Sequence, residues 1–423
     1  MTSWADIEDD EVPINSNVIK QRAWTGSLPT SISLKDESVS KHLTEGVELV
    51  DSDIEYNLRN YHYSACDNNS SDAVKRERGT IRCGDTVVRR TFHYTPEYTE
   101  NDAEELKGLL HSFDQCKVYD SEEGCLLSLF YYEDSTKING KWFLSTCKKI
   151  NAFDSRWPTP QSVSFGDSFV EALHYLKICE ANPVGASKDV LKYTSLEDYT
   201  RHLDKNKVYT YILRNNLQNR IVCLAPDVPT VYFVGAFDKT TSLLVEGNDS
   251  KIDWPCRHTF TSVDHLLKYV HTINWKTKQG VIVYLPDQTQ VKILNTEYKK
   301  YYQARDSASC IMYRYFELRR EIYLKRNVET AVDKMCRFKE LYGDYTNVFN
   351  LAEDRINMLA SKIYKSYVNK YIRKKNVMLP ENEFKVIQKC HNWHKLDRDN
   401  NRVSEGKVKE ILNVTHASIL YVM

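Results

Sequence analysis

The sequence lacks features that mark several specialised classes of protein. No apolar run approaches the roughly 20 residues that span a bilayer, and residues 1–6 have neither a basic nor an apolar leader segment, so we expect a protein that is not secreted. The eleven cysteines include no C-x-x-C pair and their number is odd, which is typical of a reducing compartment, the cytoplasm or nucleus. The formal net charge is zero, which argues against strong non-specific attraction of the whole molecule to nucleic acid or an anionic membrane.

The composition is that of an ordinary globular protein, and the charge is distributed unevenly along the chain. Of its 423 residues, 41% are hydrophobic and 27% are charged, which is enough for two or three domains and a substantial core. Residues 1–45 are acidic and polar and predict a flexible N-terminal arm. Between residues 319 and 375, Lys and Arg are about twice as frequent as Asp and Glu, which is more typical of a solvated helical face than of an RNA site.

Residues 46–310 predict a strand-rich domain with a few inserted helices. Short segments of alternating, β-branched or aromatic residues indicate strands. These segments cover residues 86–88, 126–132, 141–146, 208–213, 220–224, 231–237, 280–285 and 291–294. Asn139 and Gly140 are a hairpin-turn signal, because both central positions of a type I′ turn require positive φ, and this turn would pair the second of these strands with the third.

Residues 311–423 predict a separate helical domain. Apolar residues recur there at three- and four-residue spacing and indicate one buried helix face. These residues are Ile356, Leu359, Ile363, Tyr367 and Tyr371. Pro380 indicates the start of another helix, and Ser404 the N-cap of a further one. The two parts together predict an α+β fold, with an antiparallel-sheet domain followed by an all-helical C-terminal domain.

Four segments of the strand-rich part occur in the order of the motifs of one enzyme family. Residues 78–81 (RGTI) with 87–90 (VVRR) match the strand pair before the active-site lysine, and residues 123–128 (EGCLLS) match the end of a K-x-D-G-S-L motif. Residues 209–210 with 219–222 (NRIV) match a third motif, and residues 279–283 (QGVIV) with 291–294 (VKIL) stand in the places of E-G-x-V and K-x-K motifs. This part of the chain resembles the adenylyltransferase (nucleotidyltransferase) domain of phage-type RNA ligases, which is followed by a helical C-terminal domain.

The resemblance fails at the reactive side chains. In that family a lysine three residues before the motif glycine attacks the α-phosphate of ATP, and here that position is Ser121. Leu213 and Gln279 replace the glutamates of the third and fourth motifs, and Leu294 replaces the second lysine of the last motif. Since phosphoryl transfer depends on electrostatic stabilisation by metal ions and lysines, the resemblance implies a pseudoenzyme without a catalytic residue and without a certain cofactor.

The motif residues that remain, and the basic residues after them, define the predicted binding surface. The residues expected to contact RNA or a nucleotide are Glu123, Gly124, Arg220, Lys292, Lys299 and Arg305. The last two lie in a run of tyrosines and basic residues at 298–315 that could offer stacking platforms for bases. Packing of these tyrosines in a core is the more frequent explanation.

A second resemblance is carried by four further segments. They are residues 142–149 (WFLSTCKK), 153–157 (FDSRW), 369–372 (NKYI) and 390–394 (CHNWH). In their combination the chain resembles, over nearly its whole length, proteins of large nucleocytoplasmic DNA viruses, including the immediate-early infected-cell protein family of iridoviruses. The resemblance implies a viral protein expressed in the host cytoplasm or nucleus. Its expected partners are RNA and viral or host proteins, and no membrane.

Two alternative functions remain open. An active RNA ligase using ATP and Mg²⁺ would need a relocated lysine, such as Lys117, Lys148 or Lys149. A non-enzymatic interaction protein would use the acidic arm and the helical domain, and an exposed apolar stripe on the helix at residues 351–375 would favour it.

No resident metal ion is predicted. Cys390, His391 and His394 have ligand-like spacing but lack a second Cys/His pair, so a packed helix is favoured. Residues 397–408 resemble a Ca²⁺ loop only at its start, because Arg402 and Val408 stand where glycine and glutamate are needed. This segment predicts a turn between helices.

Overall fold

The computed structural model describes residues 44–134, 140–156, 163–176, 193–215, 221–306, 310–324 and 328–423. Almost all of the predicted N-terminal arm lies outside these ranges, as do Asn139 and Arg220. The chain divides into two compact units, one ending at Lys299 and the other beginning at Lys300. The predicted domain limits at residues 45/46 and 310/311 remain predictions.

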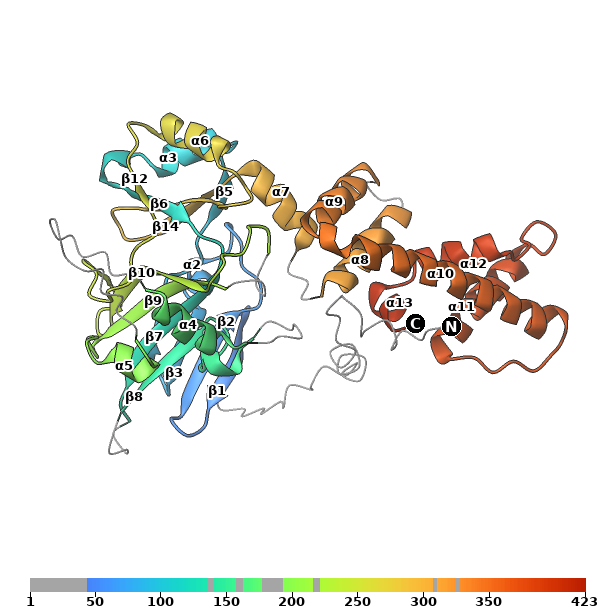
Figure 1. Ribbon diagram of the computed structural model, residues 1–423, viewed down its shortest axis with the longest axis horizontal. Coiled ribbons are helices and arrows are strands. Elements are labelled where there is room, and N and C mark those ends of the chain that lie inside the picture. Colours follow the sequence, from blue (N-terminus) through green and yellow to red (C-terminus); the bar gives the residue numbers. More distant parts are fainter. Residues whose placement is uncertain are drawn as a thin grey trace. The chain divides into compact units, whose positions relative to one another are not determined.

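The first unit is built on three sheets (Figure 1). In the first sheet the order is β1 (Val47–Asp53), β2 (Leu58–Tyr63), β3 (Arg78–Cys83) and β4 (Thr86–Arg89). In the second it is β11 (Leu244–Val245), β10 (Thr230–Asp238), β9 (Lys207–Arg214), β7 (Cys125–Tyr132) and β8 (Lys141–Thr146). In the third it is β12 (Arg257–His258), β6 (Lys117–Ser121), β13 (Gly280–Tyr284), β14 (Gln290–Leu294) and β5 (Glu97–Thr99). Neighbouring strands are antiparallel, except that β14 and β5 run parallel.

Short helices cover the sheets of this unit. They are α2 (Asp72–Lys75), α3 (Ala103–Leu109), η2 (Phe113–Gln115), η3 (Ala152–Asp154), α4 (Phe165–His174), α5 (Leu196–Thr200) and α6 (Val263–Thr272). A serine hydroxyl accepts a backbone N–H at the start of α2, α4, α5 and α6, which explains where these helices begin. One core cluster lies between the second sheet and α4 and α5. A second lies among the three sheets, and a third lies between the third sheet and α3 and α6.

The second unit is helical, as predicted. The boundary between the units falls within α7 (Thr296–Arg305). The helices that follow are α8 (Ile311–Tyr323), α9 (Val328–Leu341), η4 (Gly343–Tyr345), α10 (Thr346–Tyr367), a π-helical turn (Val368–Ile372), α11 (Glu381–Leu396), α12 (Glu405–Asn413) and α13 (Ala417–Val422). In the described ranges no helix is long and apolar enough to cross a membrane. The α+β prediction is confirmed.

Several local predictions for the helical unit are confirmed. Ile356, Leu359, Ile363 and Tyr367 are buried along α10. The next helix, α11, begins directly after its predicted proline. The hydroxyl of Ser404 accepts the backbone N–H at the third position of α12, with an oxygen–nitrogen distance of 3.2 Å.

The strand predictions are confirmed except at one segment. β8 has the predicted bounds, and β7 pairs with β8 as the hairpin signal required, although residues 135–139 of the turn lie outside the described residues. The strand expected at 220–224 is wrong, because residues 221–223 form a bend. The backbone N–H groups of this bend donate to the carboxylate of Glu123 and are therefore not free to extend a sheet.

Candidate nucleotide or RNA site

The loop at residues 121–124 joins the third sheet to the second. Ser121 is the last residue of β6 and lies opposite Gly280 of β13. Gly124 has no room for a side chain, because a Cβ there would clash with the carbonyl oxygen of Leu213 in β9. The glycine of the first motif is therefore required by the close approach of the strand that carries the third motif.

All four positions at which the family's reactive residues are replaced are buried. The exposed fraction is 4% for Ser121, 0% for Leu213, 8% for Gln279 and 2% for Leu294. These side chains are neutral, so they offer neither a cation for a phosphate group nor a carboxylate for Mg²⁺. All four of the positions where the motifs lack their reactive residues are thus enclosed by the fold.

Gln279 makes a bond that the glutamate of the family could not make. Its Nε2 donates to the backbone oxygen of Glu122, at a distance of 2.7 Å. An ionised carboxylate can only accept hydrogen bonds, so it would face the carbonyl oxygen with like charge. The amide thus holds the 121–124 loop against the start of β13, which is a structural task.

Leu213 packs into the core beneath α4 and α5, whereas Arg214, the next residue of β9, faces the 121–124 loop. Arg214 forms an ion pair with Glu122, with 2.7 Å between Nη1 and Oε2, and its Nη2 donates to the backbone oxygen of Leu224. Burial raises the pKa of Glu122, while the positive charges of Arg214 and Lys278 oppose that rise. Arg214 was not predicted; its place next to Leu213 on a strand of alternating faces was the available signal.

Glu123 holds the bend at 221–223 in place. Its carboxylate accepts the backbone N–H groups of Ile221, Val222 and Cys223 at 3.1–3.2 Å, and the hydroxyl of Tyr298 at 2.7 Å. Burial raises the pKa of Glu123, and these four donors oppose the rise because they favour the ionised form. The protein itself therefore engages both carboxylate oxygens, so Glu123 positions the neighbouring backbone.

One carboxylate beside β14, that of Glu97, is paired with one basic residue and feels the charge of two others. Lys292 pairs with Glu97 of β5, with 2.8 Å between Nζ and Oε1, and Lys299 and Arg78 act on the same carboxylate. Burial raises the pKa of Glu97, but the positive charges of Lys292, Lys299 and Arg78 outweigh it, so that the net pKa lies below its usual value. We call Arg78, Lys292 and Lys299 the basic cluster; three cations and one anion leave it a net positive charge.

The proposed replacements for the missing lysine are engaged elsewhere or placed at a distance. Lys149 pairs with Asp51, with 3.0 Å between Nζ and Oδ1. Lys117 starts β6, whose other end is Ser121, and four strand steps separate the two backbones by roughly 13 Å. Lys148 is exposed in the turn after β8.

Lys278, which the motifs did not single out, directly precedes Gln279 and pairs with the buried carboxylate of Asp120. Burial lowers the pKa of Lys278, but the hydrogen bond and negative charge of Asp120 outweigh this effect, so that the net pKa lies above its usual value. The lysine beside the loop is therefore held as an ammonium ion, which is a poor nucleophile.

The run of tyrosines and basic residues after Lys292 is mostly packed. Tyr298 in the first unit is buried, as are Tyr301 and Tyr315 in the second. Arg305 is also buried, with its guanidinium group 5.9 Å from the ring centre of Tyr342. Of the six predicted contact residues, Lys292 pairs with Glu97, and the charge of Lys299 also lowers the pKa of that carboxyl. Arg305 is buried, and Glu123 and Gly124 shape the loop. Arg220 lies outside the described residues.

The three residues of the sequence with ligand-like spacing lie along α11. Cys390 is buried, and the ring of His391 stacks on that of Tyr371 with 3.8 Å between ring centres. Nδ1 of His394 lies 2.6 Å from the backbone oxygen of Asn401, in the turn before α12. Each side chain thus has its own neighbours in the packing of this helix.

Comparison with known proteins gives similar structures that are ligases. An archaeal ATP-dependent RNA ligase matches 72% of this chain and 71% of its own, with 10% identity and a TM-score of 0.36. The RNA ligase of Naegleria gruberi matches 49% of this chain and 57% of its own, with 9% identity and a TM-score of 0.30. No family model matches the chain.

The sequence relatives are immediate-early ICP-46 proteins of iridoviruses, which confirms that prediction. The homologue of Invertebrate iridescent virus 3 is 26% identical over 319 residues, covering 74% of this chain and 63% of that protein. The homologue of Invertebrate iridescent virus 6 is 22% identical over 346 residues, covering 79% and 71%. The protein of Frog virus 3 is 23% identical over 270 residues, covering 62% of each. The chain thus spans less than two thirds of the length of the first and third of these relatives.

Proposed function

We propose that this chain is a ligase-like viral protein that does not form a covalent adenylate and that binds RNA through the basic cluster. The observation that carries the proposal is Ser121, a buried serine at the position where the family has its nucleophile. A serine hydroxyl needs an adjacent base to attack a phosphate. The contacts described for the 121–124 loop are instead those of a folded core.

The electrostatics of the loop support the absence of adenylation. The nearby lysine, Lys278, is paired with Asp120, and the nearby arginine, Arg214, is paired with Glu122. Each cation is thus neutralised by a carboxylate of the protein. A triphosphate with its Mg²⁺ would have to compete with these pairs, at the cost of leaving a buried carboxylate without its partner.

The basic cluster supports RNA as the ligand. Lys292 and Glu97 keep part of their side chains exposed, with side-chain exposures of 20% and 39%. A group of cations with a net positive charge attracts the phosphate backbone without reading sequence. RNA is favoured over a free nucleotide because the Lys292–Glu97 pair is part-exposed, whereas the four motif positions are enclosed.

The first test is covalent labelling. We expect no labelled protein after incubation of the purified full chain with radiolabelled ATP, and separately GTP, in Mg²⁺ or Mn²⁺, followed by denaturing electrophoresis. The physical reason is that the loop presents no deprotonated amine. A labelled band that disappears when Lys278, Lys117, Lys148 or Lys149 is replaced by methionine would establish a relocated nucleophile and contradict the proposal.

The second prediction concerns charge in the basic cluster. Lys292→Ala should weaken binding of a single-stranded RNA oligonucleotide and reduce the slope of log K against log salt by about 0.7, the value for one phosphate contact. Glu97→Gln should do the opposite and strengthen binding, since it removes the cluster's negative charge. Both are measured by fluorescence anisotropy over a range of salt concentrations.

Lys107→Ala is the matched control for this experiment. Lys107 is also a part-exposed lysine in an ion pair, with Asp264 at 3.0 Å and with Glu104 at 3.8 Å, but it lies on α3. It should leave the affinity unchanged. Equal effects of Lys107→Ala and Lys292→Ala, or no RNA binding by the unaltered chain, would count against the basic cluster.

A non-enzymatic interaction protein gains little support from α10. Between residues 351 and 375 the exposed large apolar side chains are Leu351, Met358 and Ile372, which stand seven and fourteen residues apart. Asp354 and Lys362 are exposed between them. Three separated side chains are normal for a solvated helix and do not form the apolar stripe that this alternative requires.

A further inference from the structure

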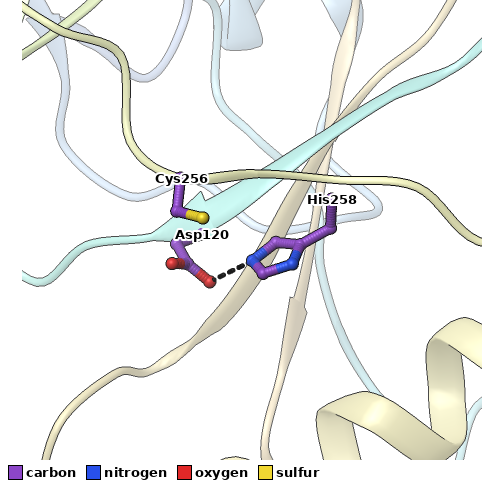
Figure 2. A group of neighbouring side chains, drawn as sticks. All are labelled: Asp120, Cys256 and His258. Atoms are coloured by element: carbon purple, nitrogen blue, oxygen red, sulfur yellow. Dashed lines mark hydrogen bonds and ion pairs between the residues drawn. The ribbon is translucent and has the colours of Figure 1, made fainter. Parts of the chain in front are cut away.

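Three potential metal ligands from two distant segments of the sequence meet at the outer edge of the third sheet. They are Asp120 of β6, Cys256 directly before β12, and His258 of β12. Each offers one ligand atom, and these atoms all lie within 4.8 Å of one another (Figure 2). Of the groups that the described residues form, this is the one that combines three such ligands. The basic cluster and the 121–124 loop use none of the three.

The pairing of the strands explains why these side chains converge. β12 is antiparallel to β6, with Arg257 opposite Tyr119 and His258 opposite Val118. The register places Cys256 opposite Asp120, and the backbone oxygen of Cys256 accepts the N–H of Asp120 at 2.9 Å. Residues two apart on a strand share a face, so the cysteine and the histidine lie on the same side of the sheet as the aspartate.

The orientation of the histidine favours a metal site over a catalytic triad. Nε2 of His258 lies 2.8 Å from Oδ1 of Asp120, and Figure 2 shows the sulfur of Cys256 on this side of the ring, with the other ring nitrogen turned away. In a triad the two ring nitrogens would serve the acid and the nucleophile separately. Here one nitrogen, one oxygen and one sulfur face a common point.

We propose that Asp120, Cys256 and His258 bind one divalent transition-metal ion of the zinc class. A thiolate together with an imidazole selects a borderline or soft ion and disfavours Mg²⁺ and Ca²⁺, which prefer oxygen ligands. Zinc bonds of roughly 2.0–2.3 Å place neighbouring ligand atoms about 3–4 Å apart. Nε2 of His258 and Oδ1 of Asp120, now 2.8 Å apart, would separate slightly on binding, and all three ligand atoms already lie within 4.8 Å of one another. Three protein ligands leave one position for water.

The surroundings provide the outer shell that such a site needs. Lys278 binds Oδ2 of Asp120 and leaves Oδ1 for the ion. Aspartate and thiolate together balance the charge of a divalent ion, so the lysine can stay as the partner of the second oxygen. The rings of Phe260 and Tyr269 pack against the imidazole, with ring centres 5.9 Å and 4.9 Å away, and fix its orientation.

Access to the site is provided by its position at the sheet edge. Cys256 is exposed and carries a free thiol, and Lys278 and His258 are part-exposed. The hydroxyl of Tyr269 lies 3.3 Å from Nε2 of His258 and would move aside when the ion binds. A bound ion would clamp the two-residue strand β12 to β6, whose last residue is Ser121.

The test is metal binding by the purified full chain after chelator treatment. We expect one Zn²⁺ per chain in a titration against a chromophoric competitor, and a thiolate-to-cobalt absorption band when Co²⁺ replaces Zn²⁺. Cys256→Ser and His258→Gln should each weaken the affinity at least about 10-fold, since even loss of an outer-shell partner costs 10–100-fold. Binding should weaken as the pH falls, because the thiol must lose its proton.

Two controls make the result specific. Cys336→Ser removes another exposed cysteine, on α9, and His394→Gln removes a histidine of α11; both should bind Zn²⁺ and Co²⁺ as the unaltered chain does. Circular dichroism shows whether each variant is folded. No Zn²⁺ at micromolar concentration, a cobalt spectrum of the unaltered chain without a thiolate band, or unchanged binding in folded Cys256→Ser would each overturn the proposal.

Discussion

Glu123→Ala is expected to lower the free energy of unfolding by about 3 kcal/mol, because it leaves several donors without an acceptor. The backbone N–H groups of Ile221, Val222 and Cys223 and the hydroxyl of Tyr298 all donate to this carboxylate. A buried donor that loses its partner costs about 1–3 kcal/mol. The total cost is smaller than four times this value, because the bend can move toward solvent, where water accepts its N–H groups. Urea unfolding followed by circular dichroism measures the change.

The controls separate the carboxylate's hydrogen bonds from its charge. Glu104→Ala removes a carboxylate that is almost fully exposed and should change the free energy of unfolding by less than about 0.5 kcal/mol. Glu123→Gln keeps the shape and one acceptor oxygen but turns an NH₂ group toward backbone donors. Its free energy of unfolding should therefore lie between those of Glu123→Ala and Glu104→Ala. Equal stabilities of Glu123→Ala and Glu104→Ala would show that the bend does not depend on Glu123.

Glu123 also shows where inference from the sequence stops. Strands such as β7, β8 and β14 were predicted because alternation of side chains along a strand is a local property. Residues 220–224 have the same β-branched pattern, yet a carboxylate nearly one hundred residues earlier in the chain takes their donors. The sequence of that segment does not indicate its contact with Glu123, so the segment was wrongly predicted as a strand.

The candidate site likewise combines residues that the sequence predicted with residues that only the tertiary structure revealed. Lys292 was predicted because it stands in a motif of fixed spacing, while its partner Glu97 was not predicted and depends on β5 lying beside β14. The convergence of Asp120, Cys256 and His258 depends on a two-residue strand that no periodicity could reveal. The motifs located the loop, and only the tertiary structure showed which charges surround it.

The burial of Ser121 bears on how the proposed absence of adenylation should be understood. If the replaced lysine were the only defect, an open nucleotide pocket would remain and a single substitution would restore the first chemical step. The four replaced positions are instead enclosed, and Gln279 donates to the loop backbone where the family has a carboxylate. Under the proposal that the chain does not form an adenylate, adaptation of the packing around the replaced residues would account for both observations.

Ser121→Lys is therefore expected to destabilise the protein by about 2–3 kcal/mol and to restore no labelling with ATP. The side chain at this position is 4% exposed, so a lysine must either displace its neighbours or carry an ammonium group into the core, and overpacking alone costs about 1–3 kcal/mol. Ser121→Ala, which only removes the hydroxyl, should change the free energy of unfolding by less than about 1 kcal/mol. Urea unfolding and the labelling assay are run on both variants. A stable Ser121→Lys protein that becomes labelled would show that the pocket is intact and that one missing side chain silenced the enzyme.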